Sequence, residues 1–271
     1  MTLDDVKARG LVLLGCGKMG GAMLEGWLAA GIPPAAVHVI DPKPAPWLAE
    51  RGVAVNGPLP EAPAVLVLAV KPQMMAEALP QVAAIAGPDT LALSIAAGTP
   101  LARLEADLPP GTKVVRAMPN LPAAIGRGAT AIVGAAAADQ AALDLAEALL
   151  EVTGTVVQVE SEAQIDAVTG VSGSGPAYVF HLVEALAAAG EAEGLAPDLA
   201  MALARATVAG AGAQLDASPL SAAGLREGVT SPNGTTAAGL AVLMPELPDL
   251  VRRTVGAAAE RARALGREAG Q

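Results

Sequence analysis

The chain has 271 residues, a length that suits one large domain or two ordinary ones. Its formal net charge is −10 and its aromatic residues are two Trp, one Tyr and one Phe, so it lacks the basic surface and the stacking side chains that nucleic-acid binding needs. No long apolar span appears, and the single cysteine excludes an internal disulfide and a Cys-rich metal site, so we expect a cytoplasmic protein without a membrane, nucleic-acid or metal partner.

The first recognisable unit is a strand, a glycine turn and a helix. The apolar run at 11–14 leads into Gly15-Cys16-Gly17-Lys18-Met19-Gly20, and apolar residues at helical spacing continue to residue 30. In this GxGxxG pattern the glycines allow a tight turn, close approach of a pyrophosphate and contact between helix and strand. Asp41 ends the next apolar run about 20 positions after Gly20, where an acidic residue meets the adenosine ribose. The pattern predicts dinucleotide binding; the alternative is a glycine-rich turn with a chance Asp.

Four further apolar runs follow, separated by helical or turn segments. They lie at 64–70, 91–95, 114–117 and 129–133. This alternation predicts a Rossmann-type, doubly wound, mainly parallel sheet over residues 1–159. Ligands of such sheets lie beyond the carboxyl ends of the strands. Three turns are therefore candidates for the cofactor crevice: Lys71-Pro72-Gln73, Ala97-Gly98-Thr99 and Met118-Pro119-Asn120.

From residue 160 onward the sequence changes to alanine-rich helical patterns without a strand signal. These patterns lie at 162–171, 176–190, 197–213, 235–244 and 248–266. Several begin with a proline, which the first turn of a helix tolerates. We predict an all-helical domain over residues 160–271. Because its small residues suit close helix packing, we expect another subunit to complete its core in at least a dimer.

Two polar segments interrupt the helical patterns. The segment 166–178, which contains Ser174, is either a loop facing the reactive end of the cofactor or a hinge before a capped helix. The segment 228–240 joins the turn residues Ser-Pro-Asn-Gly to a helical pattern, with Thr235 or Thr236 as the N-cap. Free N–H groups and the positive end of the helix dipole suit a carboxylate or a phosphate there. The alternative is a plain capped helix.

Taken together, five motifs resemble those of the pyrroline-5-carboxylate reductases, in the same order along the chain. They are Gly15–Gly20, Ala69–Gln73, Arg116–Asn120, Asp166–Tyr178 and Leu225–Thr236. The resemblance implies NAD(P)H-dependent reduction of the cyclic imine 1-pyrroline-5-carboxylate to L-proline, the last step of proline biosynthesis. It also implies a homodimer with intertwined helical domains, often assembled further into larger rings of dimers.

The resemblance also implies roles for individual residues. Those implied for NADP or NAD are Gly15, Cys16, Gly17, Lys18, Met19 and Gly20 at the pyrophosphate, Asn56 at the adenosine ribose, and Ala69, Val70, Lys71, Pro72, Ala96, Ala97 and Gly98 toward the nicotinamide. Asn120, in the third candidate turn, is a further cofactor-binding candidate. Those implied for the substrate are Asn233, Gly234, Thr235 and Thr236 through their backbone N–H groups, with Ser174 nearby. The Thr236 hydroxyl would lie near the ring nitrogen as the catalytic group. Hydride transfer to an imine needs orientation and a hydrogen bond at nitrogen more than a strong nucleophile.

Some questions stay open at the level of the sequence. Asp41 favours the free ribose hydroxyl of NAD, Lys43 is able to accept a 2′-phosphate, and only the family resemblance favours NADPH. A β-hydroxyacid-type dehydrogenase is an alternative, but its catalytic lysine is missing from the helical pattern 176–190. A non-catalytic nucleotide-binding regulator is another, although it would not need an intact loop at 231–236. His181 suits a structural role better than that of an acid.

Overall fold

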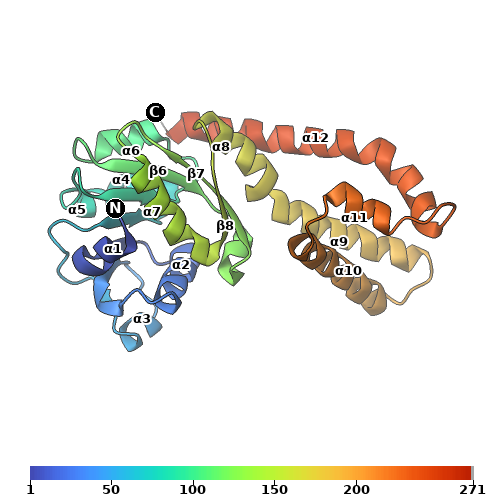
Figure 1. Cartoon of the computed structure of the whole chain (residues 1–271), viewed down its shortest axis with the longest axis horizontal. Helices are drawn as coiled ribbons and strands as arrows, with labels where there is room; N and C mark the ends of the chain where they lie inside the picture. The colour runs from blue at the N-terminus through green and yellow to red at the C-terminus, as the bar shows by residue number, and fades with distance from the viewer. Residues whose placement is uncertain (270–271) are drawn as a thin grey trace. The chain divides into compact units, whose positions relative to one another are not determined.

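The computed structural model describes residues 1–269 as two compact units (Figure 1). The first unit contains Met1–Gly173 together with the described residues from Ala257 onward, and the second contains Ser174–Gly256. This division falls later in the chain than the expected boundary after residue 159, and it returns the end of the last helix to the first unit. Within residues 1–269, no helix has both the length and the apolar character needed to cross a membrane.

An eight-stranded sheet forms the centre of the first unit (Figure 1). Its strands are β1 (Leu11–Leu14), β2 (Val37–Ile40), β3 (Ala54–Val55), β4 (Val65–Leu68), β5 (Leu91–Ser94), β6 (Lys113–Met118), β7 (Gly128–Gly134) and β8 (Gly154–Gln158), in the order β3-β2-β1-β4-β5-β6-β7-β8. All neighbouring strands are parallel except β6 and β7. The predicted doubly wound, mainly parallel sheet is confirmed. Strands β3 and β8 were not predicted because neither contains a long apolar run.

Helices cover both faces of this sheet. One face carries α1 (Leu3–Arg9), α2 (Lys18–Ala29), α3 (Trp47–Glu50) and α7 (Gln140–Leu150), and the other carries α4 (Pro72–Ala78), α5 (Pro80–Ala83), α6 (Leu101–Asp107) and α8 (Ala163–Val168). Side chains alternate along a strand, so Leu11 and Leu13 join the first core while Val12 and Leu14 join the second. Burial on both faces explains why the central strands read as continuous apolar runs.

The second unit contains helices and, among its described residues, no strand. Its helices are α9 (Gly175–Ala192), α10 (Pro197–Ala217), α11 (Ala222–Gly228) and the first part of α12 (Thr235–Ala269). The all-helical prediction is confirmed, although α11 was not predicted. The prediction of separate helices at 235–244 and 248–266 was wrong, because α12 continues through Pro245 and Pro248. Each proline removes one backbone hydrogen bond from the helix, but the residues of the flanking turns still form theirs, so the helix continues.

A π-helical turn joins α8 to α9 where the sequence predicted a break between helices. It spans Thr169–Gly173. The Thr169 hydroxyl donates to the carbonyl of Ile165 at 2.8 Å, and the Ser172 hydroxyl donates to the carbonyl of Val168 at 3.2 Å. Such wide turns occur frequently at functional sites. The chain leaves the first unit directly after this turn.

Candidate active site

The glycine turn Gly15–Gly20 follows β1, at the point where the strand order changes direction between β1 and β4. Gly15 has a φ of 91°, and a Cβ atom there would lie 2.9 Å from the side chain of Val70. A Cβ atom on Gly20 would lie 2.5 Å from the carbonyl oxygen of Gly15. A Cβ atom on Gly17, in contrast, would meet no atom within 4 Å. The turn is therefore closely packed against the protein and open at its second glycine, which fits a pyrophosphate at the N-terminus of α2.

Asp41 and Asn56 connect this turn to the ends of β2 and β3. The Asp41 carboxylate accepts hydrogen bonds from the N–H of Cys16 through Oδ2 and from the N–H of Lys43 through Oδ1, both at 2.7 Å. Asn56, with a φ of 51°, accepts from the N–H of Asp41 at 3.0 Å and donates to its carbonyl at 2.8 Å. These hydrogen bonds fix the carboxylate beside the glycine turn, where an adenosine ribose lies in dinucleotide-binding sheets.

Cys16 belongs to the glycine turn, and its partly buried side chain packs against the first core. Burial raises the pKa of Cys16 to about 11, and the nearby carboxylates of Asp41 and Glu25 contribute to the rise. The thiol is therefore protonated at neutral pH and is a poor nucleophile. What Cys16 contributes to the turn is its backbone N–H, which bonds to Asp41.

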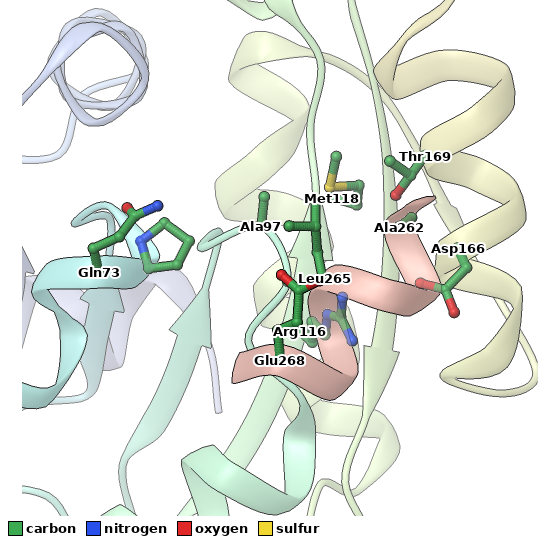
Figure 2. Close-up of a pocket in the computed structure, with 11 residues that line it drawn as sticks. Gln73, Ala97, Arg116, Met118, Asp166, Thr169, Ala262, Leu265 and Glu268 are labelled. Carbon is green, nitrogen blue, oxygen red and sulfur yellow. The ribbon is translucent and has the colours of Figure 1, made fainter. Parts of the chain in front are cut away.

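A pocket of about 560 Å³ lies beside the carboxyl ends of β5 and β6, within the first unit (Figure 2). Its lining residues are Pro72, Gln73, Ala97, Gly98, Arg116, Met118, Asp166, Thr169, Ala262, Leu265 and Glu268. Figure 2 shows Arg116 next to Leu265 and Glu268 of α12, with Asp166 and Thr169 to one side. Of the residues expected on the nicotinamide side, the structure thus brings Pro72, Ala97 and Gly98 together around one cavity.

Arg116 lines this pocket with its charged side chain, and no role was predicted for it individually. Arg116 is 7% exposed, and its Nη1 donates a hydrogen bond to Oε1 of Glu162 at 2.6 Å. The same carboxylate oxygen accepts from the N–H of Leu101 at 2.7 Å, so it ties β6, α6 and the residue before α8 together. The available signal was an arginine within an otherwise apolar strand pattern, because arginine is seldom buried without a partner.

The remaining cofactor candidates of the first unit fall into four environments. Ala69 and Val70 lie against the glycine turn, and Ala96 is buried. Lys18, Lys43 and Lys71 are exposed. The Asn120 side chain donates to the carbonyl of Ser172 at 3.0 Å and accepts from the N–H of Ala129 at 2.9 Å, so it braces the π-helical turn and β7. A contact between Asn120 and a cofactor stays a prediction.

The expected substrate residues belong to the second unit. Asn233 has a φ of 58°, the left-handed conformation that asparagine was expected to tolerate, and the N–H of Gly234 donates to the carbonyl of Ser231 at 3.0 Å. Helix α12 begins at Thr235, so the N–H groups of Thr235 and Thr236 have no carbonyl to bond within the helix. The turn therefore presents the donors that suit a carboxylate. Ser174, before α9, makes no capping hydrogen bond with its side chain.

Comparison with known proteins gives consistent matches along the chain. Residues 11–98 match the family model described as NADP oxidoreductase coenzyme F420-dependent, and residues 162–265 match the model for pyrroline-5-carboxylate reductase dimerisation. The pyrroline-5-carboxylate reductase of Pseudomonas aeruginosa is 39% identical over 268 residues, which covers 96% of this chain and 98% of that protein.

Solved structures agree with these matches. The structure of a pyrroline-5-carboxylate reductase from Coxiella burnetii has a TM-score of 0.89 at 32% identity, covering 95% of this chain and 98% of that one. The pyrroline carboxylate reductase of Plasmodium falciparum, solved with NADP bound, has a TM-score of 0.78 at 26% identity, covering 95% and 98%.

Proposed function

The chain belongs to the pyrroline-5-carboxylate reductase family, and from this premise we propose how its own residues carry out the reaction. The protein reduces 1-pyrroline-5-carboxylate to proline with NAD(P)H. When bound, NAD(P)H supplies the hydride. The observation that carries our assignment of roles is the glycine turn, which is closely packed at Gly15 and Gly20 and open at Gly17.

In this proposal the dinucleotide lies along the carboxyl edge of the sheet. The glycine turn binds the pyrophosphate, Asp41 and Asn56 bind the adenosine ribose, and the pocket at Pro72 and Gly98 takes the nicotinamide. The order of these groups supports the proposal, because they follow β3, β2, β1, β4 and β5, which are adjacent in the sheet. An extended dinucleotide spans such a crevice across the point where the strand order changes direction.

The substrate is held by the turn before α12. The backbone N–H groups of Asn233, Thr235 and Thr236 bind its carboxylate, whereas the N–H of Gly234 already donates to the carbonyl of Ser231 and closes the turn. The Thr236 hydroxyl forms a hydrogen bond with the ring nitrogen, and Ser174 is a further polar group. A helix start suits an anion, and a hydroxyl both donates and accepts. His181 is a poor candidate for the acid, because its ring bonds to Glu184 at 2.9 Å on the exposed surface of its own helix.

A homodimer is supported by the match of residues 162–265 to the dimerisation model. The second unit has a buried cluster of only three alanines, Ala187, Ala200 and Ala204. Its helices α9 and α10 expose many large apolar side chains: Val179, Phe180, Leu182, Leu186, Leu199, Met201, Leu203 and Leu215. Large apolar side chains exposed in such numbers on two neighbouring helices are typical of an interface. From the family resemblance we further propose that the helical domains of the two subunits are intertwined and that the dimers assemble into rings. We also propose that the enzyme is cytoplasmic.

The proposed function is tested by adding 1-pyrroline-5-carboxylate to the purified protein with NADH or NADPH. We expect loss of the absorbance of the reduced cofactor and formation of proline. A β-hydroxyacid in the oxidative direction, with NAD or NADP, is the matched control for the alternative dehydrogenase. Two outcomes would contradict the proposal. In one, the protein oxidises the β-hydroxyacid but does not reduce 1-pyrroline-5-carboxylate; in the other, it turns over neither substrate with either cofactor.

A further inference from the structure

The carboxylate of Asp41 is held through both of its oxygens at the end of β2. Oδ2 accepts from the N–H of Cys16 and Oδ1 accepts from the N–H of Lys43, each at 2.7 Å. The side chain of Asn56 bonds to both the N–H and the carbonyl of Asp41. A carboxylate fixed in this way cannot turn away from a ligand that lies against the glycine turn.

NADPH differs from NADH by a phosphate on the 2′ oxygen of the adenosine ribose. In sheets of this kind, an acidic residue at the end of β2 accepts a hydrogen bond from the free 2′ hydroxyl. Each oxygen of Asp41 has a second lone pair left for that bond. A 2′-phosphate would instead bring a further negative charge of roughly −1.5 to −2 beside the carboxylate. Building on the cofactor placement proposed above, we infer that Asp41 makes NADH the preferred cofactor of this enzyme.

Lys43 is the cation on the same loop that could offset this repulsion. It contacts Asp41 through its backbone N–H, while its side chain is exposed. Attraction between an exposed, mobile ammonium and a phosphate is weak and is screened by salt. The repulsion from Asp41 acts at short range and from a fixed position, so it determines the preference.

The first test is the ratio of kcat/KM for NADH to kcat/KM for NADPH, measured with 1-pyrroline-5-carboxylate at one pH and one salt concentration. We expect a ratio on the order of tenfold in favour of NADH, as for two like charges a few ångströms apart in a largely aqueous site. A ratio of one or less would overturn the inference. Calorimetric binding of ADP-ribose and of 2′-phospho-ADP-ribose gives the same comparison without turnover. If the protein discriminates between these two ligands but does not reduce the imine, the proposed function fails and the inference stands.

The second test separates cofactor choice from a purely structural role. Asp41→Asn removes the charge but keeps the size and one acceptor oxygen, and Asp41→Ser is the second variant if the first does not fold. We expect the ratio to move toward NADPH by about tenfold. If Asp41 only braces the glycine turn, both cofactors lose the same factor and the ratio stays unchanged, which would refute the inference. Glu50→Gln, which removes an exposed carboxylate from α3, is the control and should leave the ratio as it is. An equal shift in that variant would also refute it.

Discussion

The guanidinium of Arg116 and the carboxylate of Glu162 form an ion pair at 2.6 Å, and the side chain of Arg116 is only 8% exposed. The same carboxylate oxygen accepts the N–H of Leu101. Glu162→Ala would leave the guanidinium without an anion and the N–H without its acceptor. We expect this variant to lower the free energy of unfolding of the first unit by about 2–3 kcal/mol. Urea denaturation followed by tryptophan fluorescence measures it, because Trp27 and Trp47 both lie in that unit.

Glu160→Ala is the matched control for the ion pair. Glu160 is exposed and lies two positions before Glu162. Its backbone N–H, not its carboxylate, makes the hydrogen bond to Gln164. We expect a change within about 0.5 kcal/mol. Equal losses in the two variants would show that the contact of Glu162 with Arg116 contributes little.

The glycine turn gives a prediction that distinguishes folding from cofactor binding. In Gly20→Ala the new methyl group would collide with the carbonyl of Gly15, so we expect a loss of several kcal/mol in stability or no folded protein. In Gly17→Ala the methyl group points into open space, so we expect a normal melting temperature. Because that space is where the pyrophosphate is proposed to lie, the KM for the reduced cofactor should rise by at least about tenfold. An unchanged KM in Gly17→Ala would place the pyrophosphate elsewhere.

The sequence predicted those features of the fold and the site that depend on residues close together in the chain, and it missed those that depend on residues far apart in the chain. The strands of the sheet interior were found because burial on both faces makes 11–14 or 65–68 apolar at every position. The glycine turn was found because its conformation depends on its own residues. The pocket beside Arg116 was not predicted, because it is lined in part by Leu265 and Glu268. These residues are distant in sequence and join the first unit only through the end of α12.

Local rules also failed where tertiary packing overrides them. The sequence predicted that one helix ends at residue 244 and that Pro248 begins another, yet α12 continues through both Pro245 and Pro248. Asp41 was identified as a contact of the ribose, but its hydrogen bonds to the backbone of Cys16 and Lys43 could not be read from spacing. Spacing predicts which groups meet at the edge of a sheet; it does not predict which of their atoms are already engaged.

The raised pKa of Cys16 leads to a prediction about its reactivity. An ordinary thiol titrates near 9.0, whereas that of Cys16 titrates near 11, mainly because it is buried. At about pH 8 the thiolate fraction is then about a hundredfold smaller than for an ordinary thiol, and alkylation should slow accordingly and accelerate as the pH rises toward 11. Since the chain has one cysteine, mass spectrometry after iodoacetamide treatment reports on this site alone. The same chain unfolded in urea is the control, and equal rates in the two states would contradict the prediction.

The exposed apolar face of α9 and α10 predicts how the dimer can be weakened. Phe180 is 56% exposed in the isolated chain. A charge buried at an interface is costly, so Phe180→Glu should weaken association by about 2 kcal/mol or more. Light scattering coupled to size exclusion should then show a shift toward the monomer, with helical circular dichroism retained. Gln81→Glu adds the same charge to an exposed position of α5 and should leave the mass unchanged. A dimer that persists in Phe180→Glu would place the interface elsewhere.

The hydroxyl of Thr236 is predicted to act on the substrate and not on the cofactor. Thr236 stands in the first turn of α12, where its exposed side chain is free to reach a ligand held by the preceding N–H groups. Removing a hydrogen bond to a charged nitrogen costs about 1.5–3 kcal/mol, so Thr236→Ala should lower kcat/KM for the imine by about 10- to 100-fold. Thr236→Ser keeps the hydroxyl and should restore most of that loss, and the Kd of the reduced cofactor should stay the same in both variants. Equal losses in the Ala and Ser variants would show that the methyl group and its packing matter instead, and an unchanged kcat/KM in Thr236→Ala would remove this residue from the reaction.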